Sequence, residues 1–325
     1  MTLKKAGDQA FLRTDPRGTH SEPTYAGALS FMRRKYTRDL DGVDLAVTGI
    51  PLDLATTNRP GARFGPRAIR AESCLLRPCN VSTRAAPFES LQVADIGDVA
   101  INTYNLEKSI AIIESAYDRI LAHGCRPLTL GGDHTIVLPI LRAMRRKHGP
   151  VGLVHVDAHA DVNDTMFGER IAHGTPFRRA VEEGLLDCRR VVQIGLRGSG
   201  YSAGDFDWPC AQGFRVVPAE ECWHRSLSPL MEEVRAQVGG GPVYLSFDID
   251  GLDPAFAPGT GTPEIGGLTT IQALEIIRGL RGLEIVGGDL VEVSPPYDPS
   301  GNTALVGANL LFEMLCVLPG VTASG

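Results

Sequence analysis

The sequence lacks any apolar run long enough to cross a membrane. Its apolar stretches, such as residues 110–113 and 151–154, are short, whereas a membrane-spanning helix needs about 20 apolar residues. Residues 1–18 are polar and contain no apolar segment of the kind found in secretory signals. These features predict a cytoplasmic protein with no membrane partner.

Paired-cysteine motifs and a large charge of one sign are also missing. The seven cysteines are scattered, without a C-x-x-C pair, which favours reduced thiols in a cytoplasm. The formal net charge is −6, and acidic and basic residues are interspersed along the chain. Because nucleic acids and anionic membranes attract a basic patch, we expect neither as a partner, and a small molecule fits better.

The length and composition are sufficient for one large hydrophobic core. The chain has 325 residues, of which 43% are hydrophobic, and α/β enzymes of this size often form one domain. Residues 1–40 are polar and without clear periodicity, which predicts an N-terminal arm that is mobile or serves an oligomer contact. We expect residues 41–325 to form a single domain, with a core that begins near Val43.

Short apolar runs bounded by Gly, Pro or Asp alternate with longer segments of helical period. The two clearest helical segments are residues 106–123 and 270–281. The expected strands are residues 45–50, 91–96, 127–130, 151–156, 191–196, 243–247 and 285–291. This alternation predicts an α/β fold in which helices cover both faces of a mostly parallel sheet.

Acidic residues and histidine gather directly after two of these expected strands. Asp157, His159 and Asp161 follow one strand at positions i, i+2 and i+4. If that segment is extended, its three side chains point the same way. Asp248 and Asp250 repeat the i, i+2 spacing after a second strand. Since ligands bind outside the carboxyl ends of strands in open α/β sheets, we expect all five side chains near one another.

A divalent metal is the simplest explanation for this gathering of charge. His134 follows the expected strand 127–130 and completes a set of four carboxylates and two imidazoles. Such groups repel one another and are costly to bury without a cation. An oxygen-rich set suits manganese, and a pair of ions about 3.5 Å apart needs shared carboxylates. Each motif alone could cap a helix or form an ordinary hydrogen bond, but the combination favours a metal centre.

Together these motifs, in this order, resemble the ureohydrolase family of arginases and agmatinases, most closely agmatinase and guanidinobutyrase. The resemblance extends from about residue 49 to residue 318 and implies a three-layer α/β/α fold with a parallel sheet of about eight strands. It also implies two Mn²⁺ ions per subunit. One ion would be held by His134, Asp157, Asp161 and Asp248, and the other by Asp157, His159, Asp248 and Asp250.

The same resemblance assigns two catalytic residues and a mechanism. A hydroxide that bridges the metals would attack the guanidinium carbon and yield urea and an amine. His173 matches the family's proton-shuttle histidine, and histidine titrates in the useful range. Glu292 matches the carboxylate that binds the guanidinium. Asp133 and His155 are interpreted as a supporting group and a buried histidine, without direct roles.

The substrate tail is left open at this point. The loop 161–168, which contains Met166, resembles that of agmatinases and guanidinobutyrases, so arginine is set aside. Agmatine ends in an ammonium group and 4-guanidinobutyrate in a carboxylate, which need opposite partners. The sequence does not distinguish these two substrates. The resemblance further implies a homotrimer or homohexamer.

Three alternatives to this enzyme remain. One is a catalytically silent relative that acts as a binding or regulatory protein. Another is a zinc deacetylase-type amidohydrolase, which would use a single zinc ion to hydrolyse an amide. The third is a structural metal site in an oligomer. The complete ligand set, together with His173 and Glu292, favours turnover over all three.

Overall fold

The computed structural model describes residues 23–324, and nine strands in this range form one sheet with the order β1-β3-β2-β4-β9-β8-β5-β6-β7. Every pair of neighbouring strands is parallel. The strands are β1 (Lys35–Tyr36), β2 (Leu45–Gly49), β3 (Val93–Asp98), β4 (Arg126–Leu130), β5 (Val151–Val156), β6 (Leu186–Leu196), β7 (Arg215–Pro218), β8 (Val243–Asp248) and β9 (Ile285–Val291). The predicted parallel sheet is confirmed, and the edge strands β1 and β7 are additions to it.

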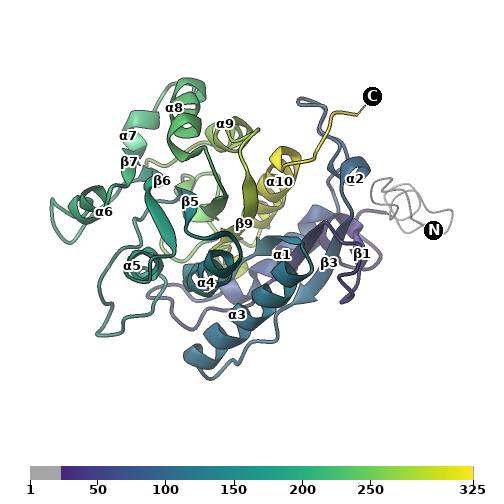
Figure 1. Ribbon diagram of the computed structural model, residues 1–325, viewed down its shortest axis with the longest axis horizontal. Coiled ribbons are helices and arrows are strands. Elements are labelled where there is room, and N and C mark those ends of the chain that lie inside the picture. The colour runs from purple at the N-terminus through teal and green to yellow at the C-terminus, as the bar shows by residue number, and fades with distance from the viewer. Residues whose placement is uncertain (1–22, 325) are drawn as a thin grey trace.

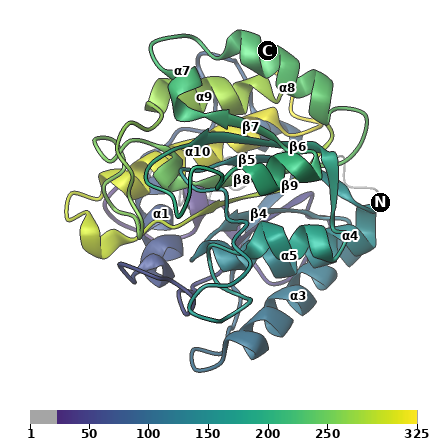
Figure 2. The same cartoon turned by 90° about the vertical axis from the view of Figure 1, so that its left-hand side faces the viewer.

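Helices cover both faces of the sheet and give three layers (Figures 1 and 2). One layer contains α3, α4 and α5, and the other contains α8, α9 and α10 (Figure 2). The helices are α1 (Gly65–Ser73), α2 (Pro87–Ser90), α3 (Leu106–Ala122), α4 (Val137–His148), α5 (Pro176–Glu182), α6 (Asp207–Gln212), α7 (Ala219–Cys222), α8 (Ser228–Val238), α9 (Thr270–Gly279) and α10 (Asn302–Val317). None of the helices within residues 23–324 is both long and apolar enough to span a bilayer.

Successive side chains of each central strand pack alternately into two hydrophobic cores, one on each face of the sheet. In β5, Leu153 packs into the core beneath α3 and α4, whereas Val154 packs into the core beneath α9 and α10. In β8, Tyr244 and Leu245 divide in the same way. This follows from the two-residue period of a strand, and it explains why these strands are mostly apolar rather than alternating.

The folded body begins earlier in the chain than Val43. Phe31 and Met32 are fully buried, and β1 pairs with β3. The backbone N–H of Phe31 donates to the buried carboxylate of Asp95 at 2.7 Å, which fixes this segment against the sheet. The polar composition of the first forty residues concealed these two apolar side chains. Residues 1–22 of the predicted arm lie outside the described range.

Four neighbouring strands end at one edge of the sheet and place the site. In order they are β4, β9, β8 and β5. The register aligns Leu130 with Leu290, Asp248 with Val291, and Val156 with Phe247. The residues that follow these strands therefore lie side by side, although they are far apart in the sequence.

Candidate metal centre and active site

A buried imidazole faces three carboxylates at this edge. His134 lies in the short 3-10 helix His134–Ile136, just after β4. Its Nδ1 lies 3.1 Å from Oδ2 of Asp157, 3.0 Å from Oδ2 of Asp161 and 3.2 Å from Oδ2 of Asp248. Ligands at right angles on an ion with bonds of about 2.1 Å are about 3 Å apart. The spacing therefore fits atoms that share one divalent ion.

Hydrogen bonds behind His134 determine which of its nitrogens faces the carboxylates as an acceptor. Ser246 Oγ donates to Asp289 Oδ1 at 2.7 Å, so it accepts from His134 Nε2 at 2.9 Å. The Nδ1 atom then carries a lone pair, and it is buried without a hydrogen-bond partner among the described residues. A lone pair directed at three carboxylate oxygens is unfavourable unless a cation lies between them.

A second group of ligand atoms shares Asp157 with the first. His159 Nδ1 lies 3.4 Å from Asp157 Oδ1 and 3.2 Å from Asp250 Oδ2. The backbone N–H of Asp250 donates to Asp248 Oδ1 at 2.9 Å, which ties the two aspartates of this motif together. The structure thus brings all six predicted ligands together in two adjoining groups.

The side chains converge through turns, so the condition of an extended segment after β5 is not met. β5 ends at Val156, and Asp161 has a φ of 53°, in the left-handed region. Asp250 lies in the 3-10 helix Ile249–Gly251, for which Asp248 is the N-cap residue. An extended backbone would place Asp161 and Asp250 farther from the ends of β5 and β8. These turns bring both residues back toward the other ligands. Backbone strain of this kind is common at functional sites.

Electrostatics show how much this cluster needs a cation. Burial raises the pKa of Asp248 well above its usual value, and the charges of Asp250 and Asp157 raise it further. Burial would lower the pKa of His134, but its three carboxylate neighbours outweigh this and raise it well above its usual value. Without a metal, some of these groups must therefore be protonated to reduce the repulsion among the carboxylates. The donors are carboxylate oxygens and imidazole nitrogens, which suit manganese and similar ions.

The two predicted catalytic residues are hydrogen-bonded to each other. His173 Nδ1 lies 3.1 Å from Glu292 Oε1, and His173 Nε2 accepts from the backbone N–H of Thr57 at 3.1 Å. Burial lowers the pKa of His173, but the hydrogen bond and charge of Glu292 outweigh burial and raise it to about 9. A second proton on this imidazole would lie on Nε2, so it can be taken up only in exchange for the hydrogen bond from Thr57.

Glu292 has one occupied and one free carboxylate oxygen. Its Oε1 accepts from the backbone N–H of His134 at 2.9 Å as well as from His173. Its Oε2 is buried and has no hydrogen-bond partner among the described residues. The φ of Glu292 is 62°, again in the left-handed region. A buried, unpaired carboxylate oxygen is costly, and the N–H groups of a guanidinium would satisfy it.

A cavity of about 350 Å³ opens beside these groups. Its lining includes four of the predicted site residues, His159, Asp161, His173 and Asp248. The rest of its lining is Thr57, Asn163, Met166, Gly174, Ser199, Gly200, Tyr201 and Thr262. Met166 and Thr262 belong to the two loops that follow the metal-ligand motifs. The cavity is large enough for a small linear substrate.

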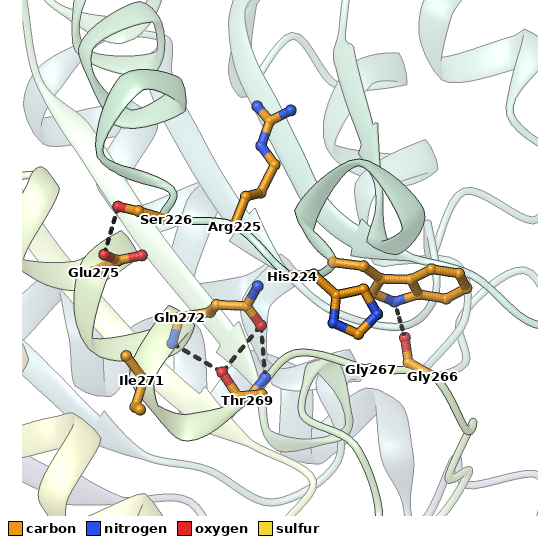
Figure 3. Close-up of a pocket in the computed structure, with 10 residues that line it drawn as sticks. His224, Arg225, Ser226, Gly266, Gly267, Thr269, Ile271, Gln272 and Glu275 are labelled. Atoms are coloured by element: carbon orange, nitrogen blue, oxygen red, sulfur yellow. Dashed lines mark hydrogen bonds between the residues drawn. The ribbon is translucent and has the colours of Figure 1, made fainter.

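A second hollow, of about 720 Å³, contains none of the predicted site residues (Figure 3). Several of its polar side chains are engaged locally. Thr269 and Gln272 form the capping box of α9, and Ser226 donates to Glu275 at 2.7 Å. We therefore place the chemistry in the smaller cavity.

Four supporting residues were missed from the sequence: Thr57, Gln193, Ser246 and Asp289. Thr57 holds His173, and Gln193 donates to His155 Nδ1 at 2.9 Å, so that His155 Nε2 can donate to Asp157. The signal for Ser246 and Asp289 was available, since each is a polar residue inside an otherwise apolar strand. Thr57 follows β2 within a loop whose path the sequence does not reveal.

Several known proteins are similar to this chain in sequence or structure. The guanidinobutyrase of Pseudomonas aeruginosa is 70% identical over 94% of this chain and 97% of its own. The mitochondrial agmatinase of Gallus gallus is 67% identical over 91% of this chain and 87% of its own. The structure of proclavaminate amidino hydrolase from Streptomyces clavuligerus has a TM-score of 0.86 and 39% identity, covering 91% of this chain and all of that one.

The fold is of the three-layer α/β/α class, and its clustered carboxylates and imidazoles could hold a metal ion, as expected of a metal-dependent hydrolase. The chain belongs to the arginase family, whose model matches residues 43–316. It is a ureohydrolase that acts on C–N bonds of guanidino compounds, as the sequence predicted.

Proposed function

We propose that the protein is a two-manganese hydrolase that releases urea from a linear guanidino compound, with 4-guanidinobutyrate preferred over agmatine. The observation that carries this proposal is the free, buried Oε2 of Glu292 beside the cluster of carboxylates and imidazoles. It offers a partner for a guanidinium next to a place for cations.

In this proposal the six ligands divide as the family resemblance implies. His134, Asp157, Asp161 and Asp248 hold one ion, and Asp157, His159, Asp248 and Asp250 hold the other. When bound, a pair of manganese ions supplies a water of lowered pKa and stabilises negative charge in the transition state. The orphaned Nδ1 of His134 and its spacing from three carboxylates support this assignment.

The protein's own groups orient the substrate and supply a proton. Glu292 Oε2 accepts from the guanidinium and holds it in one plane against the cluster. His173 holds a proton within the cavity, and we assign it the transfer of that proton to the leaving amine. Thr57 restrains the ring of His173 from the other side.

The remaining lining of the cavity favours a carboxylate tail. Apart from the four predicted site residues, its described lining residues are neutral, and they include the amide of Asn163 and the hydroxyls of Ser199 and Tyr201. These groups can donate hydrogen bonds to a carboxylate. An ammonium tail would find no carboxylate among them. The name of the guanidinobutyrase relative agrees with this preference.

Urea release by the purified, manganese-loaded protein tests the proposal. Agmatine and 4-guanidinobutyrate are a matched pair because their guanidinium ends are the same and their tails carry opposite charges. We expect 4-guanidinobutyrate to have the higher kcat/KM, and 3-guanidinopropionate and arginine to be poorer substrates. A chelated sample should release no urea. A preference for agmatine would contradict the proposed carboxylate tail. If none of the four compounds released urea, the proposed ureohydrolase activity would be wrong.

A homotrimer or homohexamer in the cytoplasm completes the proposal. Both features come from the sequence and its family resemblance. Light scattering on the purified protein measures the oligomeric state, and a monomer would contradict it.

A further inference from the structure

The turn that carries Asp250 is held in place by a single buried guanidinium. Arg197 directly follows β6, and only 7% of its surface is exposed. Its side chain donates to six backbone carbonyls, and no ion pair joins it to a carboxylate among the described residues. The carbonyls and distances are Ile265 (3.1 Å), Gly195 (3.1 Å), Gly251 (3.2 Å), Asp250 (2.7 Å), Leu252 (3.1 Å) and Glu264 (2.6 Å).

The six carbonyls come from three segments that are distant in the sequence, and Arg197 adds to the backbone pairing of Gly251 and Asp253 with Leu268. One is the end of β6, another is the turn 250–252, and the third is the loop at residues 264–265. Arg197 suits this task because its planar fork presents several N–H donors in fixed directions, which a lysine cannot do. The loop fits closely around it, since a Cβ on Gly267 would lie 2.5 Å from Arg197 Nη2.

The backbone of Arg197 also contacts the other metal-ligand segment. Its N–H donates to the carbonyl of Ala158 at 2.9 Å, and the N–H of Ala158 donates to Asp250 Oδ1 at 3.1 Å. Ala158 stands between Asp157 and His159. Arg197 therefore connects both segments that supply the second group of ligands.

The loop beyond Arg197 is fixed from its outer side as well. Trp223 Nε1 donates to the carbonyl of Gly266 at 2.8 Å. Asp253 Oδ2 accepts from the N–H groups of Gly266 and Gly267. The guanidinium thus completes a frame around residues 250–253 and is not an isolated surface contact.

The charge of Arg197 is unusual for so buried a position. Burial lowers its pKa, whereas the negative charges of Asp250 and Asp157 act in the opposite direction. Buried arginines are usually paired with carboxylates. Here the guanidinium meets only carbonyls, and the nearest acidic groups are kept available for another cation.

We infer that Arg197 is a positioning residue for the metal centre, which acts by fixing the Asp250 turn so that its carboxylate meets His159 and Asp157 in a ligand geometry. The inference rests on the proposed function. Groups that orient metal ligands from behind typically change metal affinity by about 10–100-fold when they are removed.

Arg190 provides a matched control on the same strand. It lies in β6 toward the opposite end and also donates to backbone carbonyls, those of Val238 and Pro242. Its partners contain no predicted metal ligand. Removing either arginine takes a largely buried guanidinium from backbone carbonyls, but only Arg197 touches the Asp250 turn.

The test compares Arg197→Met, Arg197→Lys and Arg190→Met as full-length proteins. Bound manganese per subunit, manganese affinity, and the rise in Tm on adding manganese are measured, followed by kcat and KM. We expect Arg190→Met to lower Tm but to keep the wild-type manganese affinity and the wild-type rise. Arg197→Met should bind manganese about 10–100-fold more weakly and show a smaller rise, and Arg197→Lys should be intermediate.

If the Arg197 variants have a lower Tm but keep the wild-type manganese affinity, the inference is overturned, because they would then behave like Arg190→Met. Loss of folding in both Arg197 variants, under conditions where Arg190→Met folds, would also contradict a role in positioning the ligand turn. Failure of the proposed function looks different. In that case the wild-type protein itself would bind no manganese, or would bind it and release no urea.

Discussion

The bodies and the carboxyl ends of the same strands have opposite designs. Within β5 and β8, Leu153 and Leu245 are buried among apolar side chains and contribute to stability. Directly after the apolar run, Asp157 and Asp248 are also buried, and the charge of Asp157 raises the pKa of Asp248. The body of a strand holds the fold together by the hydrophobic effect, whereas its end holds buried carboxylates whose charge needs a metal ion or protons to offset it. Burying the carboxylates of the site therefore destabilises the fold, and the apolar bodies of the strands offset this.

Asp250→Ala should have the largest effect on the functional end. The substitution removes a ligand from the second group, so we expect one manganese per subunit instead of two. Turnover should fall by more than about a hundredfold, because even supporting groups are worth about 10–100-fold. Urea release and bound manganese measure the two effects. A fully active Asp250→Ala protein would rule out the two-metal mechanism.

Leu245→Ala tests the body of β8 in the opposite sense. Removing this buried side chain should lower the free energy of unfolding by about 2–5 kcal/mol. The manganese content of the folded protein should remain that of the wild type. Denaturant unfolding and metal analysis measure both quantities in Leu245→Ala and Asp250→Ala. The same change in free energy of unfolding and in manganese content in both variants would contradict the comparison.

Removal of the metal should destabilise the end more than the body. A ligand present at about 100 times its Kd stabilises the folded state by about 2.7 kcal/mol. We therefore expect chelation to lower Tm and manganese to restore it. Hydrogen exchange should increase most in residues 157–161 and 248–253. A uniform increase over the whole sheet would argue against a local effect of the cation.

Glu292→Gln should weaken substrate binding while both metals stay bound. The amide keeps the shape of the side chain but loses the charge that pairs with a guanidinium, and hydrogen bonds to charged groups are worth about 1.5–3 kcal/mol. The corresponding rise in KM is about 10–100-fold. Steady-state kinetics with metal analysis would count against the assigned role if KM stayed at the wild-type value.

The smallest expected effect is on the pH dependence of kcat/KM. Burial lowers the pKa of His173, but Glu292 outweighs burial and raises it to about 9. If protonated His173 is the proton donor, kcat/KM should fall as the pH rises through about 9. In Glu292→Gln the opposing charge is gone, so this fall should move to lower pH. An unchanged alkaline limb would contradict the donor role.

The same shift has a consequence for stability. The folded pKa of His173 lies above its unfolded value of about 6.5. Its contribution to stability is therefore fully present below that unfolded value and is lost as the pH rises through about 9. Unfolding of the metal-free protein at several pH values measures this contribution, and His173→Asn should remove it.

The sequence predicted the parts of the structure that depend on regular periods. Strands β5 and β9 were placed correctly at both ends, because apolar runs bounded by Gly, Pro or Asp are a local signal. Strand β1 has only two residues and gave no such signal. Phe31 and Met32 were missed because their burial depends on contacts with Asp95 and Ser73, which are distant in sequence.

The candidate site was predicted as a set of residues but not as a geometry. The alternating spacing of Asp157, His159 and Asp161 suggested an extended segment, whereas a left-handed residue and a turn bring them together. Local spacing cannot reveal such a turn, because its backbone groups pair with residues that are distant in sequence, as Asp157 does with Ile194 and Ala158 with Arg197. The roles of His173 and Glu292 remain predictions, which the variants above test.

Two manganese ions at this edge of the sheet are proposed to hydrolyse a guanidino substrate. A titration of the metal-free protein with manganese, with bound metal and urea release from 4-guanidinobutyrate recorded on the same samples, tests this proposal most directly. We predict that urea release rises with bound manganese and reaches its maximum at two ions per subunit. Urea release that is complete without bound manganese, or absent when both ions are bound, would contradict the account.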